Sequence, residues 1–468
     1  MSKHLDLLDR SVPPGKMIIM LAWPVFIEQL MQIMVGYVDT AMVAALGIDA
    51  TASVSVNNSF VFLTMGLILG IGTGYSVLVS RAIGAGRPDY AKDVIRQSMH
   101  FIMGMGLFMM FAYIAVFSPN LATMMNAEDS IKENARDYLR ILGYSRLFYV
   151  SMLTTNNIHR GAGNTRIPMA SNLTNNLLNI CGNFLLIYPT RTISVFGLSF
   201  RMWGAGLGVR GAAIATSLAC AVAALISFAK LYDSRFELAI SLKDNYKFKP
   251  GMLKDALSIG VPVALDRIII SGGQMIITRL CAGLGNATLA AHNFATTAES
   301  ICYMPILGFM ISAQTLVAAS LGAKDAELAK RYQKTSLKYA VGIMSFSAAM
   351  LYIFAPNLIG FFTKEPEVLE MAVKALRIQA FAEPCFAVAA VYGGVLKGAG
   401  DVRFSVYVSV IGMWCVRIML ALVLVNHFGM GLNGVWIPMA LDWLARAAVF
   451  TLRIRSGKWQ TAWKIKEV

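Results

Sequence analysis

The sequence has few charged residues for its length. Asp, Glu, Lys and Arg make up 14% of its 468 residues, whereas a soluble domain usually carries about 25%. Apolar residues reach 57% and stand in long uninterrupted blocks. This composition excludes an ordinary soluble domain and predicts an all-α polytopic membrane protein, because a helix satisfies its own backbone hydrogen bonds within lipid.

Cysteine is also scarce, and the sequence lacks the usual catalytic motifs. The six cysteines stand singly inside apolar blocks with no CxxC pair, which argues against zinc and redox sites. There is no HExxH or GxSxG, and His100, His159, His292 and His427 are far apart. We therefore expect no enzyme, no cofactor and no firm metal site, and we keep an intramembrane enzyme only as a remote alternative.

The formal charge of +15 does not indicate a nucleic-acid partner, since Lys and Arg lie in short loops and form no continuous basic face. The partners we expect are the lipid bilayer and a small molecule, with the chain acting as a monomer. The apolar blocks predict twelve spans, at roughly 17–46, 52–80, 94–117, 133–158, 166–189, 206–230, 254–282, 289–318, 332–355, 370–396, 403–427 and 432–456.

Twelve spans place both termini on one side of the membrane. With that side inside, Lys and Arg on inner loops and tails outnumber those on outer loops by about three to one. The opening Met1–Lys16 is polar, and the apolar run after it is too long for a signal peptide. We expect a multi-pass plasma-membrane (inner-membrane) protein with both termini in the cytoplasm.

The chain contains an internal repeat. An offset of 238 residues places Pro24 on Pro262 and Glu28 on Asp266, and an offset of 237 places RGAGNTR (160–166) on KGAGDVR (397–403). Two six-span copies must enter the membrane in the same orientation, related by a pseudo-two-fold axis along its normal. We predict an N-lobe at 1–232, a cytoplasmic linker at 233–253 and a C-lobe at 254–468, forming two six-helix bundles around a central cleft.

Ionisable residues inside the spans are costly and should face a partner or a watery cavity. Asp442 and Arg446 are four residues apart and can pair on one helix face. Arg146 and Glu383 occupy equivalent positions with opposite charge, so they form either a cross-lobe pair or two separate sites. The full set is Glu28, Asp39, Asp266, Glu299, Glu383, Asp442, Arg146, Arg267, Arg279, Arg417 and Arg446.

An asparagine stripe follows one face of the fifth span, at Asn172, Asn175, Asn176, Asn179 and Asn183. It can serve for hydrogen bonds between helices. It can also supply neutral oxygens to a cation beside a carboxylate, as hard cations require. We predict a coupling cation at Asp39 with Asn176, Asn179 and Asn183, where either Na+ or a proton would bind.

Several motifs resemble the MATE (multidrug and toxic compound extrusion) family across about residues 17–455. They are VDTAMVAALG (38–47), SRAIGAGR (80–87), ASLGAKD (319–325), the paired RGAGNTR and KGAGDVR loops, LGNATLAAHNF (284–294) and AESICYMPILGF (298–309). The resemblance implies two six-helix bundles around a V-shaped cleft, and efflux of amphipathic, often cationic, compounds driven by Na+ or H+. The family's first-span aspartate matches Asp39.

The chain departs from both branches of the family. The second aspartate of the proton-coupled branch is Asn183 here, four residues after Asn179, and the acids of the sodium-coupled branch fall at Ile270 and Phe386. We predict a cation-coupled antiporter for drugs or metabolites whose substrate cavity is lined by Asp266, Glu299, Glu383, Glu28 and Arg146. The alternative is a lipid-linked glycan flippase, against which the excess of intramembrane acids argues.

Overall fold

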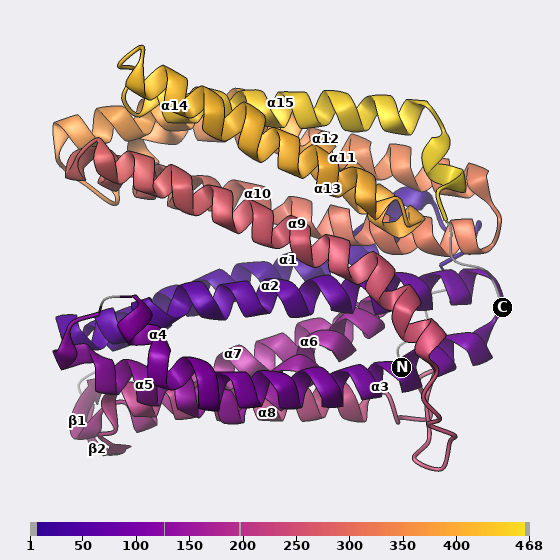
Figure 1. Ribbon diagram of the computed structural model, residues 1–468, viewed down its shortest axis with the longest axis horizontal. Helices are drawn as coiled ribbons and strands as arrows, with labels where there is room; N and C mark the ends of the chain where they lie inside the picture. The colour runs from indigo at the N-terminus through magenta and orange to yellow at the C-terminus, as the bar shows by residue number, and fades with distance from the viewer. Residues whose placement is uncertain (1–6, 126, 196–197, 464–468) are drawn as a thin grey trace.

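The helices form two groups that lie side by side (Figure 1). A computed structural model describes residues 7–125, 127–195 and 198–463. The first group, the N-lobe, holds α1 (Pro14–Ala44), α2 (Ile48–Gly84), α3 (Pro88–Phe111), a π-helical turn η1 (Ala112–Phe117), α4 (Ser118–Met124), α5 (Asp129–Tyr144), α6 (Arg146–Gly161), α7 (Arg166–Leu186) and α8 (Gly208–Ala229).

The second group is the C-lobe. It holds α9 (Pro250–Gly283), α10 (Asn286–Gly322), α11 (Ala326–Gly360), α12 (Pro366–Ala399), α13 (Val402–Val410), a π-helical turn η2 (Ile411–Ile418), α14 (Met419–Asn426), α15 (Asn433–Arg455) and a short 3₁₀ helix η3 (Lys458–Thr461). Among the described residues, β1 (Pro189–Val195) and β2 (Leu198–Ala205) pair as an antiparallel hairpin between α7 and α8.

Among the described residues, ten helical segments are long and apolar enough to cross a membrane. The two other predicted spans are helical as well but differ in character. The span at 133–158 is divided into α5 and α6, which meet at Ser145. The span at 166–189 is α7, whose asparagine stripe makes it more polar than the others. The helical fold class is therefore confirmed.

Local sequence explains where several helices begin. Pro14, Pro88, Pro250 and Pro366 each stand in a first turn, where the missing N–H is not needed. The turns α1–α2 and α9–α10 pass through Gly47 and Gly285, whose φ values of 113° and 110° suit glycine alone. The two copies of the repeat thus share a turn as well as a sequence pattern.

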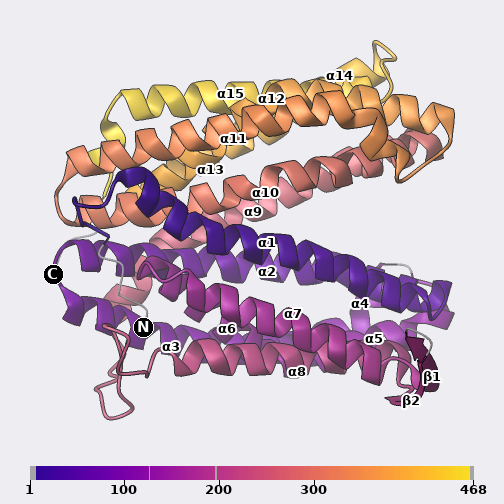
Figure 2. The ribbon, with the colours of Figure 1, turned by 180° about the vertical axis from the view of Figure 1, so that it is seen from behind.

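The lobes converge at the end of the molecule where both chain termini lie, here named the terminal end, and diverge toward the opposite, distal end (Figures 1 and 2). Glycines allow the close approach. A methyl group on Gly70 would lie 2.5 Å from the Ala264 backbone, and one on Gly84 would lie 1.8 Å from the Ala319 carbonyl. A methyl group on Gly272, farther toward the distal end, would meet nothing within 4 Å.

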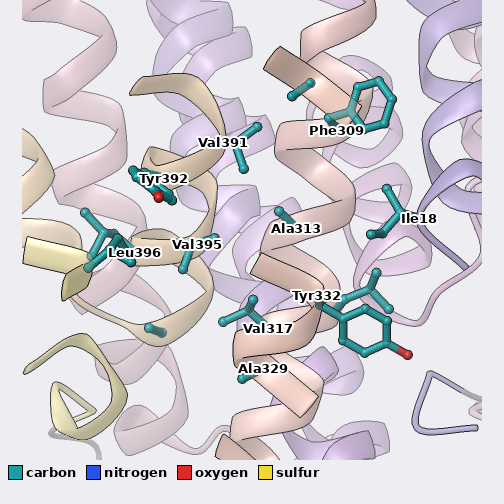
Figure 3. Close-up of a cluster of buried hydrophobic side chains, with 14 of the residues drawn as sticks. Ile18, Phe309, Ala313, Val317, Ala329, Tyr332, Val391, Tyr392, Val395 and Leu396 are labelled. Atoms are coloured by element: carbon teal, nitrogen blue, oxygen red, sulfur yellow. The ribbon is translucent and has the colours of Figure 1, made fainter. Parts of the chain in front are cut away.

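The first helix of each lobe packs against both lobes. In its terminal half, α1 adds Met17 and Ile18 to a core cluster built largely from α10, α11 and α12 (Figure 3). In its distal half, Met42 and Val43 pack inside the N-lobe. The ninth helix repeats the arrangement: Ala256, Ile259 and Val263 join the N-lobe cluster, whereas Ile277 and Cys281 belong to the C-lobe.

Both ends of the chain also cross to the opposite lobe. Leu7, 1% exposed, lies in the C-lobe cluster, and its carbonyl accepts a hydrogen bond from the Tyr332 hydroxyl at 3.1 Å. The Trp463 ring lies under the Arg81 guanidinium of α2, 3.9 Å from ring centroid to Cζ. These contacts add to the closure of the terminal end.

The linker between the lobes is fastened to the N-lobe. The Gln97 amide donates to the Lys247 carbonyl and accepts from the Lys249 amide, both at 2.8 Å. Leu231, Phe236, Leu238 and Ile240 are buried in the N-lobe cluster. The linker therefore belongs with the N-lobe up to the start of α9.

Candidate functional site

Asp39 is held by the side chains of α7 in the distal half of the N-lobe. The Asn183 amide donates to Asp39 Oδ1 at 2.7 Å. With the Asn179 amide oriented so that its nitrogen faces the carboxylate, that nitrogen lies 2.7 and 2.9 Å from the two Asp39 oxygens, and its oxygen accepts from the Thr216 hydroxyl at 2.9 Å. Among the described residues, no basic side chain pairs with Asp39.

This arrangement suits a monovalent cation. A carboxylate without a basic partner supplies negative charge, and Asn183 Oδ1 is buried with no hydrogen-bond partner. Hard cations take several oxygens, and a proton needs only the carboxylate. No cluster of three or more His, Cys, Asp or Glu that could hold a metal ion occurs in the described part of the chain.

The helices α1 and α7 run in register along this face. Asn172 donates to Glu28 and Asn183 donates to Asp39, so both contacts join residues 144 positions apart. The asparagine stripe is therefore divided between two acids about three helical turns apart. Asn176 is buried and accepts from Asn175 at 3.4 Å rather than bonding Asp39.

Glu28 and Asp266 are each engaged by a base of their own lobe. The Arg160 guanidinium bonds Glu28 Oε1, and Lys397 Nζ lies 3.6 Å from Asp266 Oδ2. Both acids are 6% exposed. Because each carries a counter-ion, they are less available to a substrate cation than an unpaired acid would be.

The C-lobe places Glu299 of α10 beside α12. Gln379 donates to Glu299 Oε1 at 2.9 Å, and Glu383 follows Gln379 by one helical turn. Glu383 is fully buried, and neither of its oxygens has a hydrogen-bond partner. Glu299 and Glu383 are thus the predicted cavity acids that carry no salt bridge in the described structure.

Arg146 and Glu383 do not form a pair. Arg146 stays in the N-lobe, where its Nε donates to the Leu142 carbonyl and its guanidinium lies over the rings of Tyr113 and Tyr149, at 4.4 and 4.7 Å. Those rings hold Arg146 within its own lobe, so the cross-lobe pair is not formed and the alternative of two separate roles stays a prediction.

Asp442 forms the ionic centre of the C-lobe. Arg446 donates to Asp442 Oδ1 at 2.6 Å, as the four-residue spacing predicts, and Arg417 lies 2.9 Å from Oδ2. Asp442 is completely buried. Asp442 therefore lies within ion-pair distance of both arginines, while its Oδ2 and the Arg417 Nε and Nη2 have no hydrogen-bond partner in the described structure. We interpret the three residues as structural.

Sequence reasoning missed two residues of the sites. Thr216 orients Asn179, and Gln379 bonds Glu299. A lone threonine in an apolar span gave no signal. Gln379 stands one helical turn before Glu383 on the same face, and this spacing could have marked it.

A family model described as MatE matches residues 24–185 and 262–423. The chain belongs to the MatE family. The two matched segments are equally long, and they are offset by 238 residues, as the copies of the internal repeat are. The family model therefore matches each copy of the repeat once. MatE membership also accounts for the multi-pass helical fold. It confirms the family resemblance seen in the motifs.

The curated relatives span nearly the whole chain. An uncharacterized transporter, YisQ of Bacillus subtilis, is 29% identical, with 94% of each chain covered. A probable multidrug resistance protein NorM of Thermotoga maritima is 26% identical, with 95% of this chain and 93% of the relative covered. These sequences show that the resemblance is continuous and is not limited to single motifs.

Solved structures of similar fold agree. A crystal structure of a MATE protein in complex with MaD3S has a TM-score of 0.89 at 24% identity, covering 98% of this chain and 100% of the other. An outward-facing conformation of a multidrug resistance MATE family transporter has a TM-score of 0.87 at 24% identity, covering 98% and 99%. At this identity the likeness concerns the fold.

Proposed function

We propose that this MatE protein is a plasma-membrane antiporter that exports amphipathic, cationic drugs or metabolites in exchange for Na+ or H+. The observation that carries the proposal is Asp39, a carboxylate in a predicted span that is held by two amides and has no basic partner among the residues the structure describes. Placing a charge there is costly unless it binds a cation. The relative NorM is named a probable multidrug resistance protein, and that name supports export of drugs out of the cell.

The orientation follows from the distribution of Lys and Arg. With both termini in the cytoplasm, the terminal end is the cytoplasmic end, and the structure is closed there. Asp39 then lies in the outward half of α1, which is where an inwardly driven cation would enter. Loading from outside, followed by release inside, is the order that cation-driven export requires.

The C-lobe supports a cationic substrate. Glu299 and Glu383 are close to the same glutamine and carry no salt bridge in the described structure, so they give this part of the lobe negative charge. An amphipathic cation would offset that charge, and Tyr303, Phe386 and Trp443 lie nearby in edge-to-face contacts. Aromatic rings of this kind suit apolar and cationic ligands.

The test is transport by purified protein in vesicles, with Na+ and H+ gradients imposed separately. We expect Asp39→Asn to lower coupled export by about 30-fold or more, which corresponds to about 2 kcal/mol for a lost buried charged contact. Asp49→Asn, at the start of α2 and exposed, is the matched control and should transport normally. Unchanged coupled export in Asp39→Asn would remove Asp39 from the mechanism.

A further inference from the structure

Both copies of the repeat carry the same buried acid–base pair. In the N-lobe, Glu28 of α1 bonds Arg160 at the end of α6. In the C-lobe, Asp266 of α9 lies near Lys397 at the end of α12. The repeat places Glu28 on Asp266 and Arg160 on Lys397, so the two pairs are equivalent and tie the first helix of each lobe to its fourth span.

Each pair lies where the first helix changes lobes. Before Glu28, Met17 and Ile18 pack in the C-lobe cluster, and after it Met42 and Val43 pack in the N-lobe. Asp266 has the same place in α9, between residues of the N-lobe cluster and residues of the C-lobe cluster. The terminal half of each first helix is therefore held by the opposite lobe, and the ion pair attaches it to its own.

The pairs also mark the level at which the lobes separate. Ala264, two residues before Asp266, is in close contact with Gly70 of α2. A methyl group on Gly272, six residues after Asp266, would meet no atom within 4 Å. On the other side, Ala22 is in close contact with Gly308, and a methyl group on Gly36 would meet nothing.

The two pairs differ in strength. Glu28 Oε1 accepts a hydrogen bond from the Arg160 guanidinium and another from the Asn172 amide, the latter at 2.8 Å. Among the described residues, Asp266 has only the Lys397 ammonium, at 3.6 Å. One oxygen of each acid, Glu28 Oε2 and Asp266 Oδ1, has no hydrogen-bond partner there. The residue equivalent to Asn172 is Ser409, which bonds Arg446 instead. Arginine also holds a carboxylate more rigidly than lysine does.

We propose that Glu28–Arg160 and Asp266–Lys397 are positioning pairs that decide which lobe the terminal half of each first helix follows when the terminal end opens. The strong N-lobe pair keeps α1 with its own lobe, and the weak C-lobe pair lets α9 stay with the N-lobe. This proposal rests on the proposed transport function, because only a transporter has to open that end.

The experiment measures opening of the terminal end directly. Ala319, fully buried against Gly84, is changed to cysteine in a chain whose six native cysteines are replaced, and its labelling by a maleimide is timed in detergent. We expect Glu28→Gln to raise the labelling rate by about five-fold or more, the lower limit of usual conformational coupling. Asp266→Asn should raise it less.

A rescue separates positioning from general destabilisation. Glu28→Arg combined with Arg160→Glu restores opposite charges and should return the rate most of the way to wild type. Glu327→Gln, which breaks the exposed pair with Lys330, is the control and should leave the rate unchanged. Arg160→Lys keeps the charge and should give an intermediate rate, which provides a readout even if Glu28→Gln fails to fold.

The proposal is overturned if folded Glu28→Gln and Arg160→Lys proteins label at the wild-type rate. It is also overturned if the exchanged pair, folded, labels as fast as Glu28→Gln. Labelling requires no substrate or coupling ion, so its result is independent of the Asp39 transport assay. Failure of the positioning role and failure of the antiport proposal can therefore be told apart.

Discussion

The two lobes share one sequence pattern but accommodate their buried charges differently. In the N-lobe, Asp39 is held by neutral amides and Arg146 by two aromatic rings. In the C-lobe, Asp442 binds two arginines directly. A carboxylate held by amides keeps its charge available to a mobile cation, whereas one held by arginines is already neutralised. The comparison supports the proposal that ion coupling belongs to the N-lobe.

The largest effect should come from breaking the ionic centre of the C-lobe. Asp442→Asn leaves Arg417 and Arg446 buried without a full counter-charge, so we expect a loss of about 3–5 kcal/mol in the free energy of unfolding. Thermal unfolding in detergent measures it. Glu370→Gln removes the exposed pair with Lys374 and should cost much less, because an exposed ion pair contributes little to stability. Equal losses in the two variants would mean that Asp442 is not a structural centre.

A smaller effect should distinguish cargo charge from ion coupling. Glu383→Gln removes an acid that carries no salt bridge in the described structure, so we expect cationic cargo to bind about tenfold more weakly, which is about 1.4 kcal/mol. The binding of neutral substrates should not change, and neither should the response of transport to Na+ or H+ gradients. Glu367→Gln, exposed on the same helix, is the control. A changed gradient response in Glu383→Gln would move part of the coupling to the C-lobe.

The smallest effect concerns the two chain ends. The Arg10 guanidinium and the Leu328 amide hold the pKa of Asp325 below its usual value. This contact therefore stabilises the folded N-terminal segment fully above the ordinary carboxyl pKa of about 4, and the stabilisation is lost as pH falls through the lowered value.

Hydrogen exchange at the Leu328 amide, corrected for its intrinsic pH dependence, should show this loss on acidification. Asp325→Asn should flatten the profile. The contact of Trp463 with Arg81 contains no carboxyl group, so the C-terminal segment should keep its protection over the same range. A parallel loss at both ends would show that acid loosens the whole terminal end.

Much of the fold was predictable because it depends on periodic features. The long apolar blocks, the offset between Glu28 and Asp266 and the paired glycine motifs gave the helices and the duplication. The Asp442–Arg446 pair followed from helical spacing alone. The asparagine stripe correctly indicated an acid-facing surface, since Asn183 does bond Asp39.

The sequence could not predict which charged residues form pairs when they lie far apart in the chain. Arg160 lies in a loop motif and Lys397 in its repeat, and only the folded chain shows that they reach Glu28 and Asp266. The supposed Arg146–Glu383 pair was inferred from equivalent positions, but equivalence under a pseudo-two-fold axis does not bring residues into contact. The β1–β2 hairpin was missed although residues 198–202 alternate between apolar and polar side chains, because a search for long apolar blocks passes over strands of this length.

The buried position of Leu7 in the C-lobe cluster has a consequence for the order in which the chain folds during synthesis. Its hydrogen-bond partner, Tyr332, lies 325 positions later in the chain, and the core cluster that contains Leu7 is built largely from α10, α11 and α12. The segment around Leu7 also lies against Gly163 of the N-lobe, but it cannot make its C-lobe contacts until the second copy of the repeat has been synthesised. Synthesis of the second copy, rather than insertion of the first, therefore completes the attachment of this segment.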